Sequence, residues 1–344
     1  MPVTLSNYKD LNEKIATNKY SSLFILCDYN TNEHCVHHVL SQLETSLKIE
    51  ILEIEAGEEL KNITTCSEIW SILAEYGADK KSLLINVGGG VITDLGGFVA
   101  TTFKRGIDFV NIPTSLLGMV DASFGGKNGV DLGNLKNQIG TICNPELVLI
   151  DTNFLETLPA KQIISGFAEM LKHGLICDSE YWKNCAAADI NNIESIVKLI
   201  PRSIEIKNEI VIQDPTEKGI RKALNFGHTL GHAIESYFLE TENSLLHGEA
   251  IAIGMVLESY ISLQKRLLSE QSYLEIKKVL KSIYKFVDFT ETDIESIITL
   301  LIHDKKNEYG TVQFALLDGI GKVRLNQLVE NQIIKDAFEN YKID

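Results

Sequence analysis

Residues 81–98, KSLLINVGGGVITDLGGF, decide the fold because an apolar run leads directly into a cluster of glycines. The run ends at Gly88, and Gly89 and Gly90 follow it. Without side chains, such a turn lets backbone N–H groups approach a phosphate. Counted from Gly88, however, the sixth position is Thr93, so the strict dinucleotide fingerprint is not met. Taken alone, the segment is consistent with a nucleotide site or with a tight turn only.

Three further apolar runs surround this segment, and each ends in turn residues. They are residues 21–30 (SSLFILCDYN), 106–115 (GIDFVNIPTS) and 145–154 (PELVLIDTNF). Residues 31–47 and 66–77, which lie between the runs, have helical spacing. The alternation predicts a Rossmann-like α/β domain over residues 1–158, with a largely parallel sheet that binds ligands at the carboxyl ends of its strands.

From about residue 160 the periodicity becomes helical, which predicts a mainly α-helical second domain over residues 159–344. The helical segments are residues 160–176, 193–212, 227–240, 247–268 and 272–286. A short β-like stretch interrupts them at residues 312–325. The boundary between Leu158 and Pro159 rests on this change of period.

Composition and charge exclude several classes of protein. With 44% hydrophobic and 23% charged residues, the 344-residue chain has the composition of a folded globular protein. A net charge of -15 argues against nucleic acid or an anionic membrane as the main partner. The start lacks a signal-peptide pattern, and no run of about 18 apolar residues occurs, so we expect a cytoplasmic, unanchored protein.

The scattered cysteines predict reduced thiols and no cysteine metal site; they are Cys27, Cys35, Cys66, Cys143, Cys177 and Cys185.

Residues 111–140 form a polar stretch with six glycines, which also contains Asp121, Lys127, Lys136 and Asn137. A loop of this length inside a compact domain is unusual unless it binds something. Lysine and asparagine beside glycine would suit an anionic, hydroxylated ligand. A surface loop with solvated lysines is the alternative.

Three of the eight histidines fall within residues 222–250, KALNFGHTLGHAIESYFLETENSLLHGEA. His228 and His232 are four residues apart and therefore share one face of the expected helix, and His247 opens the next helix. A catalytic zinc typically takes three protein ligands, so two histidines and a carboxylate would complete a set. Glu169 is the candidate carboxylate, because an unpaired carboxylate is costly on an apolar helix. Core or surface histidines with unrelated roles remain the alternative.

Basic residues recur beside these motifs. They are Lys172, Lys207, Arg221, Lys305 and Lys306. Each one alone is typical of a solvated surface charge. Their repetition near the expected metal and nucleotide sites indicates a cationic pocket for a phosphate or a carboxylate.

From about Glu58 to Glu249 the chain resembles the 3-dehydroquinate synthase family, the NAD- and zinc-dependent cyclases of the shikimate pathway. The matching blocks are GEELK, GGGVITDLGGFVATTFKRGI, PTSLLGMVDASFGGKNGVDLGNLKNQIG, SGFAEMLKHGLI, GIRKALNFGHTLGHAIE, LHGEAIAIGM and, nearer the C-terminus, DKKNEYG. These blocks are highly specific, and the expected reaction rests on them and not on spacing.

The resemblance implies a role for each matching residue. The ligands of a zinc or cobalt ion would be Glu169, His228 and His247, with His232 nearby in the active site. NAD would be held by Asp28, Glu58, Lys61, Gly89, Gly90, Asp94, Thr114, Ser115, Asp121, Lys127 and Lys136. An anionic sugar phosphate would be held by Lys127, Asn137, Lys172, Lys207, Arg221 and Asn225. One of the two adjacent lysines Lys305 and Lys306 would also contact it, and we expect this to be Lys306. Arg105 matches a residue that reaches the neighbouring subunit's site, which implies a homodimer.

The implied reaction converts 3-deoxy-arabino-heptulosonate 7-phosphate into 3-dehydroquinate. A secondary alcohol is oxidised transiently by NAD, phosphate is eliminated, the ketone is reduced again, and an intramolecular aldol reaction closes the ring. The chain departs from the family pattern at Phe124, Asn128 and Asp131, so the fine specificity is less determined than the reaction class.

Three other functions compete with this one. A related sugar-phosphate cyclase that makes a valiolone or deoxy-inosose ring would share the fold, NAD and metal. A metal-dependent alcohol dehydrogenase would release NADH stoichiometrically. A non-catalytic zinc- or nucleotide-binding regulatory protein would have a broken ligand set, whereas the expected positions are filled here.

Overall fold

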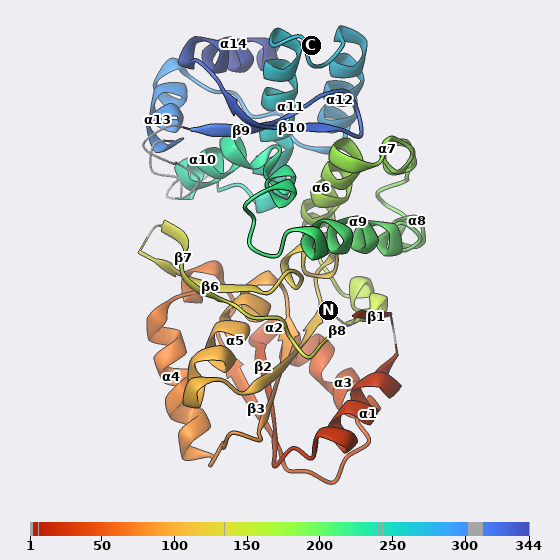
Figure 1. Cartoon of the computed structure of the whole chain (residues 1–344), viewed down its shortest axis with the longest axis vertical. Coiled ribbons are helices and arrows are strands. Elements are labelled where there is room, and N and C mark those ends of the chain that lie inside the picture. The colour runs from red at the N-terminus through yellow and green to blue at the C-terminus, as the bar shows by residue number, and fades with distance from the viewer. Residues whose placement is uncertain are drawn as a thin grey trace. The chain divides into compact units, whose positions relative to one another are not determined.

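The computed structural model describes residues 3–5, 7–133, 135–239, 241, 244–301 and 312–343. The chain divides into two compact units, Met1–Pro159 and Ala160–Asp344 (Figure 1). Each unit folds around its own elements, so the two are described separately.

Unit Met1–Pro159 is built on a six-stranded parallel sheet with the strand order β1-β8-β5-β4-β2-β3. Its strands are β1 (Val3–Leu5), β2 (Leu23–Asp28), β3 (Ile49–Ile54), β4 (Leu83–Gly88), β5 (Asp108–Pro113) and β8 (Leu147–Ile150). The expected α/β class is confirmed, and each of the four apolar runs contains a strand. After β2 the chain adds β3 at one side of β2, and β4 then lies on the other side of β2. After β4 the chain continues away from β2, to β5. The ends of β2 and β4 therefore flank the point where the strand order reverses, which is where such sheets bind ligands.

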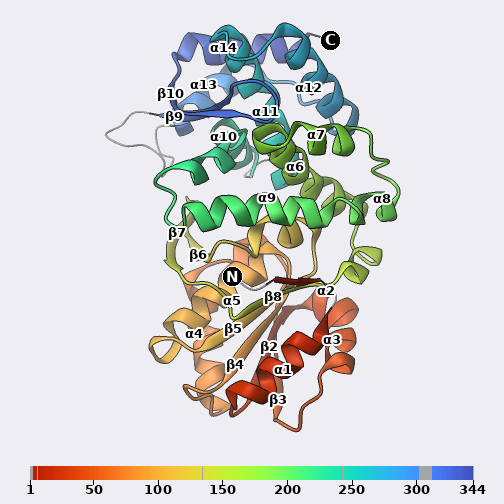
Figure 2. The ribbon, with the colours of Figure 1, turned by 45° about the vertical axis from the view of Figure 1, so that its right-hand side comes forward.

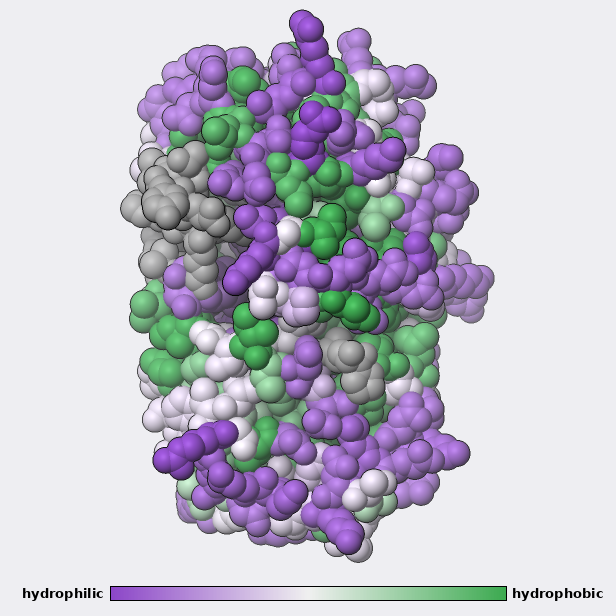
Figure 3. Space-filling model, in the orientation of Figure 1, coloured by the Kyte–Doolittle hydropathy of each residue, from purple (hydrophilic) through white to green (hydrophobic). Residues whose placement is uncertain are grey.

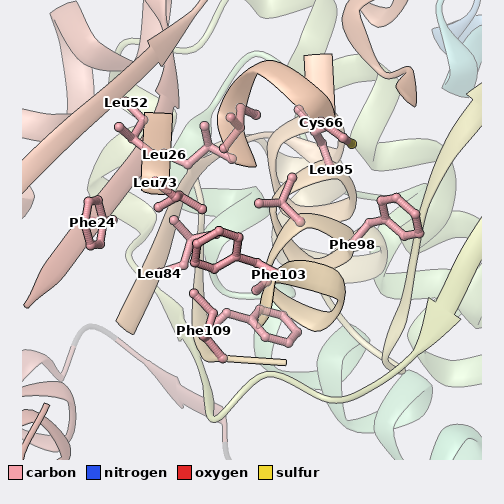
Figure 4. Packing of buried hydrophobic residues seen from close by; sticks show 14 of the residues in the cluster. Phe24, Leu26, Leu52, Cys66, Leu73, Leu84, Leu95, Phe98, Phe103 and Phe109 are labelled. Atoms are coloured by element: carbon pink, nitrogen blue, oxygen red, sulfur yellow. The ribbon is translucent and has the colours of Figure 1, made fainter. Parts of the chain in front are cut away.

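Helices cover both faces of this sheet. Figures 1 and 2 show α1 and α3 on one face and α4 and α5 on the other. The helices are α1 (Tyr8–Asn18), α2 (Tyr29–Thr31), α3 (His37–Gln42), α4 (Ile63–Glu75) and α5 (Gly90–Thr102). Phe24, Leu84, Leu95 and Phe109 pack between the sheet and α5 in the core that Figure 4 shows. Burying one such side chain contributes roughly 1.5–3 kcal/mol, so this core fixes α5 against β4.

Two glycines explain how closely α5 approaches its neighbours. A Cβ at Gly96 would overlap the Asn86 side chain on β4, and a Cβ at Gly97 would overlap the Asn128 side chain. Asn128 is itself buried and donates to the carbonyl oxygens of Gly126 and Cys143. The departure at Asn128 is therefore part of the packing beneath α5.

The stretch expected to be a loop, residues 111–140, is largely ordered structure. It contains a π-helical turn, Gly118–Ala122, and an antiparallel hairpin of β6 (Lys127–Leu132) and β7 (Leu135–Ile142). Gly129 pairs with Gly140 in this hairpin, and the pairing shifts register between Val130 and Leu132. The glycine and polar content hides the two-residue periodicity of the strands, which is why the sequence suggested a loop.

Unit Ala160–Asp344 is mainly helical, as the periodicity predicted. Its elements are α6 (Ala160–Cys177), α7 (Ser179–Ala186), α8 (Ile193–Val197), α9 (Ile200–Gln213), α10 (His228–Phe238), α11 (His247–Gln264), α12 (Glu270–Ile283), α13 (Glu291–Leu301), α14 (Asn331–Lys342) and the hairpin of β9 (Gln313–Leu317) and β10 (Val323–Leu328). The segment 193–212 is two helices, because Pro201 lacks the N–H that a helix interior needs and stands in the first turn of α9.

Glycines also bring the central helices of this unit together. A Cβ at Gly254 on α11 would overlap the carbonyl oxygen of Gly227, just before α10. A Cβ at Gly248 would overlap the carbonyl oxygen of Ser165 on α6. The three helices therefore meet backbone to backbone near the starts of α10 and α11.

The surface combines hydrophilic side chains with scattered apolar ones, as the face in Figure 3 shows. Among the described residues, no helix is both long and apolar enough to cross a membrane. The six cysteines all lie in described ranges and are free thiols, with Cys143 and Cys177 exposed.

Candidate functional site

A cluster of potential metal ligands lies in unit Ala160–Asp344, where α6, α10 and α11 meet. Glu169 comes from the middle of α6, and His228 and His247 are the first residues of α10 and α11. Glu169 Oε1 lies 3.3 Å from His228 Nε2 and 3.5 Å from His247 Nε2. Ligand atoms at about 2.1 Å from a tetrahedral zinc ion stand about 3.4 Å apart, so this donor set fits such an ion.

The environment of Glu169 supports the same fit. Its side chain is fully buried, and neither carboxylate oxygen accepts a hydrogen bond of good geometry from the described residues. Lys172, one turn later on α6, forms an ion pair with it. Burial raises the pKa of Glu169, but Lys172 and His228 outweigh burial and hold that pKa well below its usual range. The group is therefore a buried, ionised carboxylate whose oxygens face two imidazoles.

Neighbouring oxygens orient both imidazoles. His228 Nδ1 lies 3.1 Å from the carbonyl oxygen of Phe226, and His247 Nδ1 lies 3.2 Å from Glu235 Oε2. A carbonyl can only accept, and an ionised carboxylate likewise, so Nδ1 carries the proton in each ring. Each Nε2 faces Glu169 and is the ring nitrogen that would bind a metal, while an oxygen holds Nδ1–H as in carboxylate–histidine–metal sites.

The two histidines differ in charge because their surroundings differ. Burial, together with the charge of Lys172, lowers the pKa of His228 to about 4. Burial also lowers the pKa of His247, but the carboxylates of Glu235 and Glu169 outweigh it and raise that pKa to about 10. A neutral imidazole and one held between two carboxylates therefore stand side by side.

His232 lies beside the rings of His228 and His247. Its ring centroid is 5.1 Å from that of His228 and 5.8 Å from that of His247. With Glu235 and His247 it forms a second group that could hold an ion. The spacing of His228 and His232 thus pointed to the helix that carries His228, although the pair alone is not the set around Glu169. Glu235 was not singled out from the sequence, although it lies three residues after His232 on α10.

Three basic residues of the same unit are buried. The exposed fraction is 1% for Lys172, 5% for Lys207 and 3% for Arg221, which is unlike solvated surface charges. They come from α6, α9 and the 3₁₀ turn Ile220–Asn225, which contact one another. Arg221 donates to the carbonyl oxygen of Pro215, and Asn225 donates to Glu217 Oε1. Buried cations on elements that pack against one another are suited to binding an anion.

Unit Met1–Pro159 places the glycine turn at the reversal point of its sheet. Gly88 ends β4, Gly89 is the N-cap of α5 and Gly90 is its first residue. A Cβ at Gly89 would come within 3.2 Å of Ser115 Oγ, and Thr114 donates from its backbone to the carbonyl oxygen of Gly88 at 3.0 Å. The turn, Thr114 and Ser115 therefore lie together at the N-terminus of α5, a suitable place for a phosphate. Asp28 ends the adjacent strand β2 and caps α2 by accepting from Thr31.

A polar network lies farther along α5. Lys61 Nζ donates to Asp94 Oδ2 and to Asn137 Oδ1, each at 2.6 Å. Burial lowers the pKa of Lys61, but Asp94 and Glu58 outweigh it, so that pKa is raised and the ammonium stays charged. Lys136 Nζ lies 3.4 Å from Glu58 Oε1. Four residues expected to bind NAD and one expected to bind substrate are thus brought together.

Asp131, a departure from the family pattern, supports this network. Its Oδ1 accepts the backbone N–H of Asn137 at 2.5 Å, where the hairpin pairing is irregular. Asn137 has a left-handed φ of 52°, so the Asp131 carboxylate holds the backbone that carries the Asn137 amide. Phe124, the remaining departure, is buried.

For the remaining residues expected to bind NAD, substrate or the neighbouring subunit, the structure gives a position in the fold only. Asp121 lies in the π-helical turn, and Lys127 begins β6 with an exposed side chain. Arg105 is exposed and has a left-handed φ of 67°. Lys305 and Lys306 lie outside the described residues.

Comparisons with known proteins agree over nearly the whole chain. A family model described as 3-dehydroquinate synthase N-terminal matches residues 51–165, and one described as 3-dehydroquinate synthase C-terminal matches residues 166–307. The 3-dehydroquinate synthase of Parabacteroides distasonis is 42% identical over 335 residues, which cover 97% of this chain and 95% of that protein.

Two solved structures resemble the whole chain. One is 2-deoxy-scyllo-inosose synthase complexed with carbaglucose-6-phosphate, NAD+ and Co2+, and the other is 2-epi-5-epi-valiolone synthase from Streptomyces hygroscopicus with NAD+ and Zn2+ bound. Each has a TM-score of 0.86 and 26% sequence identity, and the match covers 98% of this chain and 96% of the other.

Proposed function

Because the chain belongs to the 3-dehydroquinate synthase family, we propose that it converts 3-deoxy-arabino-heptulosonate 7-phosphate into 3-dehydroquinate and phosphate. The reaction eliminates phosphate from carbon, so the enzyme would be a carbon–oxygen lyase. The observation that carries the proposal is the cluster of Glu169, His228 and His247 beside the buried cation Lys172. A metal ligand set next to a fixed positive charge is suited to a substrate that has both hydroxyls and anionic groups.

The first unit would hold NAD, which, when bound, supplies a transient hydride acceptor. Its pyrophosphate would meet the backbone N–H groups of Gly89 and Gly90 at the start of α5, with Thr114 and Ser115 beside them. Lys61 and Asp94 pair with each other and would orient the rest of the cofactor. The remaining NAD-binding residues would be Asp28, Glu58, Asp121, Lys127 and Lys136.

The second unit would hold a zinc or cobalt ion through Glu169, His228 and His247. When bound, the metal supplies Lewis acidity at the substrate's oxygens. The carbonyl of Phe226 and the carboxylate of Glu235 each accept from an Nδ1–H, so Nε2 is the ring nitrogen that would bind the metal, and His247 would release its second proton when the metal binds. His232, whose ring lies next to that of His228, would hydrogen-bond a substrate group and would not be a metal ligand.

The buried cations would bind the two ends of the substrate. Lys172, Lys207 and Arg221 lie on contacting elements and supply positive charge, while Asn225 supplies a directional amide. The further substrate residues would be Lys127, Asn137, His232 and Lys306. Arg105 is exposed on a strained turn, which supports our proposal that it serves the site of a second subunit in a homodimer.

Another sugar-phosphate cyclase is the second candidate, because structures of two such enzymes share the fold. Their sequence identity is 26%, against 42% for the synthase of Parabacteroides distasonis, which favours 3-dehydroquinate synthesis. The two candidates differ in the substrate they would bind, because 3-deoxy-arabino-heptulosonate 7-phosphate carries a carboxylate in addition to its phosphate and the related cyclases differ in the pocket for that group.

The test is to mix zinc-replete protein with NAD and 3-deoxy-arabino-heptulosonate 7-phosphate, and to follow phosphate release together with the absorbance of reduced cofactor. We expect many phosphates per enzyme without net NADH, because the hydride is returned within each turnover. Absence of phosphate release would point to another sugar phosphate. Accumulating NADH would indicate a dehydrogenase.

A further inference from the structure

A second buried carboxylate, Glu258, lies near the metal cluster but outside its ligand set. It is on α11, eleven residues after His247, and its side chain is fully buried. Its Oε2 accepts the backbone N–H of Gly227 at 2.7 Å, and its Oε1 accepts that of Leu230 at 3.0 Å. A charged group is costly to bury unless it is hydrogen-bonded, so this placement needs a reason.

The reason lies in the start of α10, which cannot supply its own cap. The first N–H groups of a helix lack partners within the helix and are usually satisfied by a side chain at the N-cap. Here the N-cap is Gly227, with a left-handed φ of 77° and no side chain. A Cβ at this position would come within 2.5 Å of Met255 Cγ, so a serine or aspartate does not fit. Glu258 provides the acceptor from a different helix, where the helix dipole also favours a negative charge.

The hydrogen bonds of Glu258 bracket a proposed metal ligand. His228 follows Gly227 directly and precedes Leu230 by two residues. His247 begins the helix that carries Glu258, so the carboxylate ties the start of α10 to the same helix that supplies the other imidazole. Close glycine packing between α10 and α11 sets the distance between the helices, and Glu258 sets the position of the first turn.

We propose that Glu258 is a positioning residue that fixes His228 in the geometry required for metal binding. This inference rests on the proposed function, because it assumes that Glu169, His228 and His247 bind the metal. Glutamine has the same shape but replaces one accepting oxygen with an NH₂ group. The NH₂ group would face the backbone N–H of Gly227 or Leu230. Both groups are donors, so one of the two hydrogen bonds would be lost and the two N–H groups would repel each other.

The experiment compares full-length wild-type protein with Glu258→Gln after loading with Co2+, and measures affinity by competition with a chelator and coordination by the visible absorption spectrum. We expect Glu258→Gln to weaken Co2+ binding by about 10- to 100-fold, as for other changes behind a metal ligand. We also expect an altered spectrum at saturating Co2+, because the His228 ring is displaced. Wild-type affinity together with an unchanged spectrum would overturn the proposal.

A matched control separates positioning from general stability. Lys277 is buried on α12, and its Nζ donates to the carbonyl oxygen of Asn340 on α14 at 2.7 Å; neither residue is among the possible metal ligands. Lys277→Met should lower the melting temperature but leave Co2+ affinity and spectrum as in the wild type. An equal loss of affinity in this variant would show that Glu258 acts through stability alone.

Two further outcomes are distinguishable. If Glu258→Gln does not fold, Glu258→Asp, which keeps the charge but shortens its reach, is tested with the same readouts and the same expectation. If the wild-type protein itself binds no Co2+, the metal assignment in the proposed function fails, and the inference fails with it.

Discussion

The two candidate sites use the same residue, glycine, for opposite purposes. In Met1–Pro159, the glycine turn at residues 88–90 leaves backbone N–H groups open at the start of α5. In Ala160–Asp344, Gly227, Gly248 and Gly254 allow three helices to meet, and the chemistry comes from side chains on those helices. The first site therefore depends on one local segment, whereas the second depends on contacts between distant segments.

This difference determines how each site should fail. Losing one side chain should destroy the second site, because no backbone group can replace an imidazole ligand. In the first unit, adding a side chain at a closely packed glycine should do more damage than removing a side chain elsewhere, because the glycines are where the backbone comes close to its neighbours.

The largest effect is expected for His247→Ala, which removes one of three proposed metal ligands. We expect loss of the bound metal and a fall in turnover of at least about a thousandfold, or about 4 kcal/mol of transition-state stabilisation. Elemental analysis and phosphate release measure the two effects, and circular dichroism checks the fold. His232→Ala is the matched control and should retain the metal. Full activity without metal in His247→Ala would refute the assignment.

The next effect tests the glycine packing in the first unit. Gly97→Ala adds a Cβ that overlaps the Asn128 side chain, and overpacking should lower the free energy of unfolding by about 3 kcal/mol. Gly133→Ala is the control, since no atom of the residues that the structure describes lies within 4 Å of its added Cβ. Only the strain of the left-handed backbone applies there, about 1 kcal/mol. Urea denaturation measures both, and equal losses would mean that contact with Asn128 is not the cause.

A smaller effect is expected for Arg221→Ala, which removes one cation of the proposed anion site. Losing a charged hydrogen bond should weaken substrate binding by about 2 kcal/mol, or roughly 30-fold. Substrate titration by calorimetry measures this affinity. The neighbouring Lys222, which donates to Asn326 Oδ1, provides the control variant Lys222→Ala, with wild-type affinity expected. Unchanged affinity in Arg221→Ala would rule out its role.

The smallest effect concerns a charge outside both sites. Asp178 caps α7, and the N–H of Tyr181, with help from Arg202, lowers its pKa. A carboxyl whose pKa is lower in the folded state stabilises above its unfolded pKa, about 3.9, and loses this contribution as pH falls through the folded value. Asp178→Ala should cost about 1 kcal/mol at pH 7.

The same measurement at acidic pH checks the sign. Urea denaturation near pH 3 should show a smaller difference between Asp178→Ala and the wild type than at pH 7. A difference that grows on acidification would contradict the assigned pKa direction.

The sequence predicted four of the six strands of the sheet, β2, β4, β5 and β8, because they are buried almost throughout and therefore read as continuous apolar runs. Strands β1 and β3 are only partly buried and were not predicted. The run 81–90 contains β4 (Leu83–Gly88), and 21–30 contains β2 (Leu23–Asp28). The hairpin of β6 and β7 was not predicted, because Gly129 and Gly140 occupy paired positions where side chains would have revealed an alternation.

For the candidate site, sequence reasoning found the residues whose type is rare or clustered. His228, His232 and His247 stood out in this way, and the apolar surroundings of Glu169 marked it as unusual. Glu235 and Glu258 carry no such signal, because both are glutamates on helices, where glutamate is common. Their importance depends on packing, such as the contact of Glu258 with an N–H 31 residues earlier in the chain.

The contact between Gly254 and the carbonyl of Gly227 has a genetic consequence. Every missense change of a glycine codon adds a Cβ, so no single-nucleotide substitution that changes residue 254 leaves that space empty. Gly77, by contrast, has no atom of the described residues within 4 Å of an added Cβ, and aspartate, which tolerates a left-handed backbone and is one nucleotide away, can replace it. Variation among descendants of this gene should therefore accumulate at codon 77 long before codon 254, whatever the pressure on catalysis.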